Sequence, residues 1–132
     1  MKKTFLLFTL ALATSFSAFA LEECPVVDVD ENYIDKVTDL IEGAPSCYEA
    51  SEFASACSLG SSRDAYMVGV TIKKCEKEFP KMSKKETAKY AYLNEKCNKK
   101  YSGMQGTMYI SMNAFCHLSV TQLFIELLTK PE

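Results

Sequence analysis

Three methionines and one histidine near the C-terminus are the first candidates for chemistry in this sequence. Met104, Met108 and Met112 recur every four residues, and His117, the only histidine of the chain, follows them. Thioether and imidazole groups are ligands that suit Cu(I), so these four side chains could form a copper site. This pattern gives one hypothesis for the function, a Met/His Cu(I)-binding protein of the periplasm.

The glycines beside these methionines favour a structural role for them instead. Gly103 and Gly106 predict a turn that contains Met104. Met108 and Met112 would then lie on the core face of the helix that follows, where methionine commonly fills irregular gaps. We therefore expect no metal ion and no cofactor, and copper binding is kept as an alternative.

Groups that could catalyse a reaction lack partners at a suitable spacing. His117 would have to serve any Ser–His–acid triad or Cys–His dyad, and it directly follows Cys116, which we expect in a disulfide. The chain contains no G-x-S-x-G and no C-x-x-C sequence. Carboxylates are plentiful, but nothing marks two of them as the acid pair of a hydrolase. We expect no catalytic residue and no enzymatic activity.

The first 20 residues have the three parts of a secretory signal peptide. A positive start at Lys2 and Lys3 precedes an apolar run over residues 5–13, and a small-x-small cleavage site ends at Ala20. The apolar run is too short to span a bilayer. We predict cleavage after Ala20 and a single mature domain, residues 21–132, in the periplasm or outside the cell and without a membrane span.

The predicted mature chain is acidic, and its charges are unevenly distributed. Without Lys2 and Lys3, 13 basic residues stand against 17 acidic ones, a net charge of about −4. Residues 22–52 hold ten acids and one base, whereas residues 73–100 hold ten lysines and four acids. Nucleic-acid binding usually needs a basic domain, so we expect no nucleic-acid partner. The two charged segments could face each other, bind a charged partner or simply be solvated.

Apolar spacing and chain breaks predict an all-α domain. Apolar residues recur at intervals of three and four, and no long run alternates as a half-buried strand would. Proline and glycine separate the periodic segments. The predicted helices cover residues 31–41, 46–57, 63–79, 84–101 and 107–129. Short connections between them predict a small bundle with antiparallel neighbours.

Three of the predicted helices begin with a serine that is followed three residues later by an acid. In such a capping box the hydroxyl accepts from an exposed N–H of the first turn, and the acid reaches back to the first N–H. The three pairs are Ser46 with Glu49, Ser61 with Asp64, and Ser83 with Glu86. Each pair stands beside a proline or glycine, which supports the predicted helix starts.

All six cysteines lie in the predicted mature chain, and an even number in an exported domain predicts disulfides. Six cysteines allow 15 pairings, but residues equidistant from a turn lie opposite each other in an antiparallel helix pair. The last two cysteines are equidistant from the turn at 103–106, and the second and fourth are equidistant from the turn at 58–62. The expected pairs are Cys97–Cys116, Cys47–Cys75 and, from the remaining two, Cys24–Cys57.

The C-terminal part of the chain resembles a known family. In order, it contains Cys97, Tyr101, Gly106-Thr107-Met108, Cys116, Val120-Thr121 and an apolar helix. This order resembles the C-terminal half of the LprI-type lysozyme-inhibitor domain, a family of small exported helical bacterial domains. The resemblance covers residues 89–128 and implies a bridge between the two cysteines. Lys89 stands where the family usually has a tryptophan.

These observations lead us to expect an exported, non-catalytic protein-binding domain, by resemblance an inhibitor of lysozyme-type muramidases. Lysozymes are commonly basic, so the acidic segment would favour their approach. The alternative within the same class is an immunity or envelope-stress protein that binds another cell-wall-active toxin. One turn contains glycine and adjoins a predicted disulfide, and we take it as the candidate binding loop. Its residues are Ser102, Gly103, Met104, Gln105, Gly106 and Thr107.

Overall fold

The computed structural model describes residues 23–130, so the predicted signal peptide, residues 1–20, lies outside the described residues. The described part contains five α-helices and no strand. They are α1 (Tyr33–Gly43), α2 (Cys47–Ala56), α3 (Arg63–Glu76), α4 (Lys84–Tyr101) and α5 (Thr107–Thr129). The all-α architecture predicted from the apolar spacing is confirmed.

The helix ends follow the local chemistry of the sequence. The predicted bounds of α4 and α5 are those of the structure, whereas α1 lies two residues later in the chain than predicted. The prediction for α3 was wrong at its end, since the helix stops at Glu76 and not at Phe79. Phe79 precedes Pro80, which disfavours helical backbone, and the Phe79 ring packs edge-on against Tyr90 at 5.4 Å.

The capping box predicted at the start of α4 is complete, and the one at α2 is half formed. Ser83 Oγ accepts from the backbone N–H of Glu86, and the Glu86 carboxylate accepts from the N–H of Ser83. At α2, Ser46 Oγ accepts from the N–H of Glu49 but donates its own proton to the Glu49 carboxylate. The Glu49 carboxylate therefore holds the Ser46 hydroxyl in place of the backbone N–H.

The capping box predicted at Ser61 forms in part, since Ser61 Oγ accepts from the N–H of Arg63 and not from that of Asp64. Ser62 precedes α3 and makes no side-chain cap. The Asp64 carboxylate accepts from the backbone N–H groups of Ser61, at 3.1 Å, and Leu59, at 2.9 Å. It does reach back to Ser61, but its side chain turns inward and is completely buried. A residue predicted as an exposed cap is therefore part of the interior.

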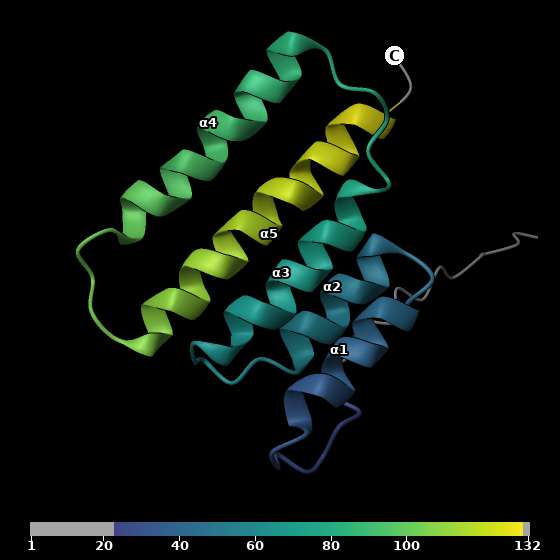
Figure 1. Cartoon of the computed structure of the whole chain (residues 1–132). Helices are drawn as coiled ribbons and strands as arrows, with labels where there is room; N and C mark the ends of the chain where they lie inside the picture. The colour runs from purple at the N-terminus through teal and green to yellow at the C-terminus, as the bar shows by residue number, and fades with distance from the viewer. Residues whose placement is uncertain (1–22, 131–132) are drawn as a thin grey trace, which may run out of the picture.

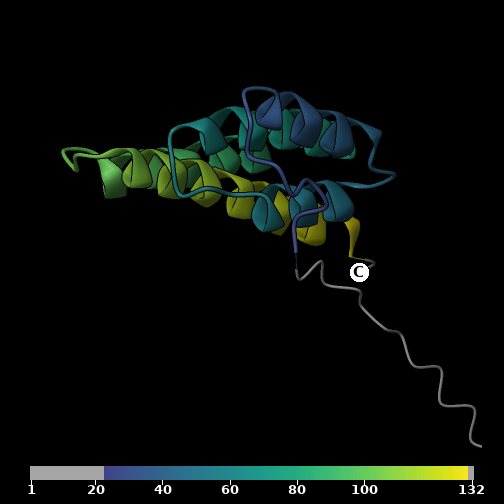
Figure 2. The same cartoon turned by 90° about the horizontal axis from the view of Figure 1, so that it is seen from below.

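The helices form a three-helix unit with a hairpin attached to it. Helices α1, α2 and α3 pack on one another, α5 lies between α3 and α4, and α4 lies alongside no helix other than α5 (Figure 1). Seen from below, the turn between α4 and α5 extends beyond the other helices (Figure 2). The main core is in the three-helix unit and includes Tyr33, Val37, Ile41, Ala50, Met67 and Val68, joined by Leu118 of α5.

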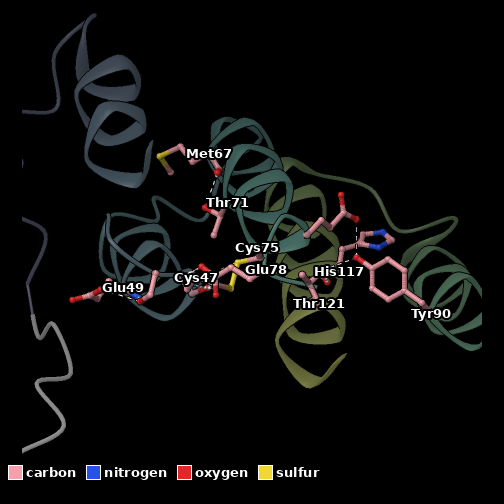
Figure 3. Close-up of a disulfide and its surroundings, with 12 residues drawn as sticks. Cys47, Glu49, Met67, Thr71, Cys75, Glu78, Tyr90, His117 and Thr121 are labelled. Atoms are coloured by element: carbon pink, nitrogen blue, oxygen red, sulfur yellow. Dashed lines mark hydrogen bonds between the residues drawn. A yellow bond between two sulfur atoms is a disulfide. The ribbon is translucent and has the colours of Figure 1, made fainter. Parts of the chain in front are cut away.

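Three disulfides staple this arrangement, and no cysteine is free in the described part of the chain. One ties the N-terminal segment to the end of α2, one joins α2 to α3, and one joins α4 to α5. The pairs are Cys24–Cys57, Cys47–Cys75 and Cys97–Cys116, of which the turn positions favour the last two and elimination gives the first. Figure 3 shows the α2–α3 bridge beside Thr71 of α3. Three bridges in so short a chain are typical of proteins from oxidising compartments.

The end of α3 holds the ends of both preceding helices. Lys74 Nζ donates to the last-turn carbonyl of Glu42 in α1 at 3.0 Å. The carboxylate of Glu78, just after α3, accepts from the first N–H of α2 at Cys47 at 2.6 Å. Helix termini leave such backbone groups without partners inside the helix, so these two contacts satisfy them. Helix α3 is thereby fixed as the base on which α5 and the hairpin lie.

Candidate binding surface on the α4–α5 hairpin

The α4–α5 hairpin is held by one disulfide and by the packing of α4 on α5. Its turn, residues 102–106, lies at the end of the molecule that is far from α1 (Figure 1). Gly103 has φ +81° and Gly106 has φ +111°, values that favour glycine because other residues have a Cβ in the way. These two glycines allow the chain to reverse within a few residues.

The predicted binding loop is brought together as one exposed tip. All six of its residues are exposed, and the chain reverses through a hydrogen bond from Met104 N–H to the carbonyl of Tyr101. Ser102 Oγ also donates to the carbonyl of Lys99 at 3.0 Å. A pocket of about 210 Å³ adjoins the tip. Its lining includes Tyr101, Met104, Tyr109, Ile110 and Asn113.

The expectation that Met108 and Met112 lie on the core face of α5 was wrong. Met108 is 53% exposed and Met112 is 41% exposed. Two small polar residues, Ser111 and Thr121, are buried on this helix instead. They are buried because each has a hydrogen-bond partner inside the protein: Ser111 has Asp64, and Thr121 has Tyr90. Apolar spacing could not reveal a buried face that is partly polar.

Tyr90 is the main anchor of α4 on the rest of the molecule. Its hydroxyl lies 2.8 Å from Thr121 Oγ1 and donates to Glu76 at the end of α3 at 3.0 Å (Figure 3). Its ring packs edge-on against Phe79 and Phe124, the latter at 5.0 Å. Burial raises the pKa of the Tyr90 hydroxyl, which therefore stays protonated and able to donate. Tyr90 fixes the start of the hairpin, while the disulfide fixes the half nearer the tip.

His117 lies between α4 and α5 in a cluster of asparagines. Its Nδ1 is 2.6 Å from Asn94 Oδ1, and its Nε2 is 2.8 Å from Asn98 Oδ1. Asn113 Nδ2 donates to the same oxygen of Asn98. Burial lowers the pKa of the His117 imidazole from its usual value near 6.5. Both ring nitrogens thus face amide oxygens of α4, the neutral ring donates its single N–H to one of them, and the histidine braces the hairpin.

The asparagine cluster could not be predicted from the sequence. Asn94, Asn98 and Asn113 are spaced as ordinary surface residues, and they meet only because α4 and α5 pack in the register set by the disulfide. His117 lies five positions after Met112, which places the two side chains on different sides of α5. The four residues of the copper hypothesis therefore do not share one face of this helix.

The acidic and basic segments meet where α1 and α3 end, since Glu42 lines one pocket together with Lys73, Lys74 and Lys77. The acidic segment lies on the N-terminal loop, α1 and the start of α2, and its ion pair Lys36–Asp30 is internal to it. The basic segment covers the end of α3 and all of α4, where Lys99 pairs with Glu95 at 2.8 Å. The hairpin tip is therefore nearest to lysines, and α1 lies at the other side of the molecule (Figure 1).

The described residues contain neither a cluster of metal ligands nor a helix that could span a membrane. Within residues 23–130, no three His, Cys, Asp or Glu side chains gather where they could hold a metal ion. No helix in the same part of the chain has the length and apolar character to cross a membrane. Comparison of the chain with protein-family models, curated proteins and solved structures gave no match.

Proposed function

We propose that this protein is an exported, non-catalytic binding protein whose contact surface is the end of the α4–α5 hairpin. The observation that carries the proposal is the exposure of Met104, Met108 and Met112 around a turn that a disulfide holds in place. Exposed methionines are frequent at protein-binding surfaces, because their flexible, polarisable side chains adapt to a partner. The disulfide and Tyr90 order the hairpin in advance, which lowers the entropic cost of binding.

The resemblance to the LprI-type domain makes a lysozyme-type muramidase the first partner to test. The charges of the protein favour approach of a basic enzyme to α1 and oppose its approach to the hairpin tip. A basic enzyme would be attracted by the acidic residues of α1, such as Asp35 and Asp39, and repelled by Lys96 and Lys100 near the hairpin tip. The contact surface on the hairpin and the electrostatic attraction thus make different predictions for the same enzyme.

The experiment is a titration of lysozyme activity on cell walls with the oxidised protein from Leu21 onward. Several lysozyme classes are used, at low and physiological salt. Saturable inhibition that is lost in a Met108→Ser, Met112→Ser double variant supports the hairpin as the contact surface. An Asp35→Asn, Asp39→Asn variant is the matched control on α1. Inhibition lost only in that control moves the surface to α1, and no inhibition of any class removes lysozyme as the partner.

The alternative within the same class is an immunity or envelope-stress protein that binds another cell-wall-active toxin. The same hairpin would be the contact surface, so the lysozyme inhibitor and the immunity protein differ only in the partner. Co-purification from the cell envelope, with the methionine double variant as the control, separates them. A toxin that is retained by the wild type and lost with the variant would identify the partner.

Exposure of the methionines also favours a second candidate function, binding of Cu(I). Met108 and Met112 are one helical turn apart and both are accessible, and Met104 is exposed in the adjoining turn. His117 is engaged by amides on another side of α5, so sulfur ligands alone would hold the ion. Stoichiometric Cu(I) uptake that is lost in Met112→Leu supports this candidate, and absence of uptake excludes it.

A further inference from the structure

One side of the α4–α5 hairpin combines exposed apolar side chains with lysines. We call it the hairpin face and define it by six residues. They are Lys89, Lys96 and Lys100 of α4 with Met108, Met112 and Leu123 of α5. The hairpin face is separate from the loop 102–107, although Met108 and Met112 lie close to both.

Helix geometry places the three lysines on one side of α4. Cys97 and Tyr90 face α5, as their disulfide and hydrogen bond show. Asn94 and Asn98 lie toward His117, on one flank of that contact. Steps of seven and four residues return to nearly the same side of a helix, so Lys89, Lys96 and Lys100 share the other flank.

The same geometry places the apolar residues on the matching side of α5. Met108 and Met112 are one turn apart, and Leu123, which is 43% exposed, follows Met112 by almost exactly three turns. His117 lies on the opposite side of this helix. The hairpin register set by Cys97–Cys116 brings Met112 level with residue 101 and Leu123 level with residue 90. Lys100 is therefore nearly level with Met112, and Lys89 with Leu123, so lysines and apolar side chains lie side by side on the hairpin face.

The charges on the half of the hairpin nearer the tip are of one sign, whereas Lys89 follows Glu86 by three residues in α4. Residues 96–125 contain three lysines and no acid. Glu95 is paired with Lys99 at 2.8 Å, on the outer side of α4. The nearest acid on the α5 side is Glu126, at the opposite end of the hairpin beside the start of α2. Lys96 lies 5.1 Å above the exposed ring of Tyr92, which adds an aromatic side chain next to the hairpin face.

We propose that the hairpin face binds the surface of a membrane that contains anionic phospholipids. Lysines beside short apolar side chains are the chemistry of peripheral binding: the ammonium groups meet lipid phosphates, and the apolar groups enter the boundary of the acyl chains. Lysine stems are long enough to keep the charge at the headgroups while the methionines insert. The acidic α1 lies on the other side of the molecule from the hairpin tip (Figure 1), so a negative surface would favour binding with the tip towards it.

This inference goes beyond the proposed function, because vesicle binding needs no protein partner. The oxidised protein from Leu21 onward is sedimented with vesicles of phosphatidylcholine mixed with phosphatidylglycerol, and with phosphatidylcholine alone. We expect binding to the anionic vesicles that weakens with salt, and at least about tenfold weaker binding to the neutral ones. Failure to bind the anionic vesicles overturns the proposal, whether or not a protein partner binds the hairpin.

Two variants with a matched control locate the surface. Each lysine near an anionic membrane contributes about fivefold to partitioning, so replacing Lys89, Lys96 and Lys100 by Gln should lower it about a hundredfold. Met108→Ser with Met112→Ser tests the apolar contribution and should also weaken binding. The control replaces three exposed lysines outside the hairpin face: Lys73, Lys77 and Lys81. An equal loss in the control would overturn the hairpin face, and circular dichroism confirms that each variant is folded.

Discussion

The hydroxyl of Ser111 donates a hydrogen bond of 2.6 Å to the carboxylate of Asp64, 47 positions earlier in the chain. The contact joins the start of α3 to the first half of α5. Asp64 also accepts from the backbone N–H groups of Leu59 and Ser61, so a completely buried carboxylate has three donors. Buried charges are tolerated when they are satisfied in this way. The contact ties the part of α5 nearest the hairpin tip to the three-helix unit.

Replacing Asp64 by Ala should destabilise the protein by about 3 kcal/mol, because one buried and two partly buried donors lose their acceptor. The free energy of unfolding from urea titration measures the effect. Asp30→Asn, at an exposed ion pair, is the control and should leave the midpoint almost unchanged. If both variants behaved alike, Asp64 would have no special role in joining α3 to α5.

Removal of the Cys97–Cys116 bridge should loosen α4 selectively. The bridge closes a loop with a sequence separation of 19, for which about 3 kcal/mol of stabilisation is expected. Helix α4 packs along α5 and reaches α3 through the Tyr90–Glu76 hydrogen bond, and Cys97 is its one buried residue. In a Cys97→Ala, Cys116→Ala variant, the amides of α4 should exchange faster while those of α1 to α3 keep their protection. Uniform loss of protection in all helices would contradict this independence of α4.

The capping box of α4 should stabilise the protein more than the serine that precedes α3, which makes no cap. Ser83→Ala removes one acceptor from the helix start and loosens Glu86, at a cost of about 1 kcal/mol. Ser62→Ala, at the start of α3, makes no side-chain cap and is the control. Unfolding midpoints compare the two variants. An equal effect at Ser62 would show that the hydroxyl at Ser83 does not cap α4.

The same box gives a pH dependence whose sign follows from Glu86. Hydrogen bonds from Ser83 lower the pKa of the Glu86 carboxyl from its usual value near 4.5. The unfolded chain therefore takes up this proton first as the pH falls. The stability supplied by Glu86 is present above about pH 4.5 and is lost below it. Glu86→Gln should flatten that part of the pH profile of thermal unfolding.

His117 should make the hairpin sensitive to mild acid. Burial lowers the pKa of its imidazole from about 6.5, so the unfolded state binds the proton at a higher pH than the folded state. Stability should therefore fall as the pH drops below about 6.5, the usual pKa of the imidazole. His117→Gln should remove that slope in urea titrations. A stability that rises on acidification would instead mean that Asn94 and Asn98 stabilise the charged ring.

The helices could be predicted from the sequence because their ends are set by short-range chemistry. Pro80, Ser83 and Glu86 act within one turn of α4, and the glycines at 103 and 106 act within the next connection. The disulfide pairs followed from the same turns, since residues equidistant from a turn lie opposite each other.

The faces of the helices could not be predicted in this way, because they depend on distant partners. Ser111 and Thr121 are polar and lie outside the apolar spacing of α5, yet both are buried in hydrogen bonds with Asp64 and Tyr90. Met108 and Met112 are apolar and read as core, yet the positions that face α3 and α4 belong to other residues. Asn94 and Asn98 gave no pattern at all before His117 was brought between them.

The order of the three disulfides divides the chain into two covalent units. The bridges 24–57 and 47–75 overlap, whereas 97–116 closes a loop of its own, and no bridge crosses from one unit to the other. The backbone of residues 76–96 is thus the one covalent link between them. A single protease cut in the connection at 77–83 would leave two peptides joined only by non-covalent contact, that of α5 with α3 and α2 and that of Tyr90 with Glu76. That contact would become a bimolecular equilibrium, and dilution of the nicked protein would measure an affinity that chain continuity otherwise conceals.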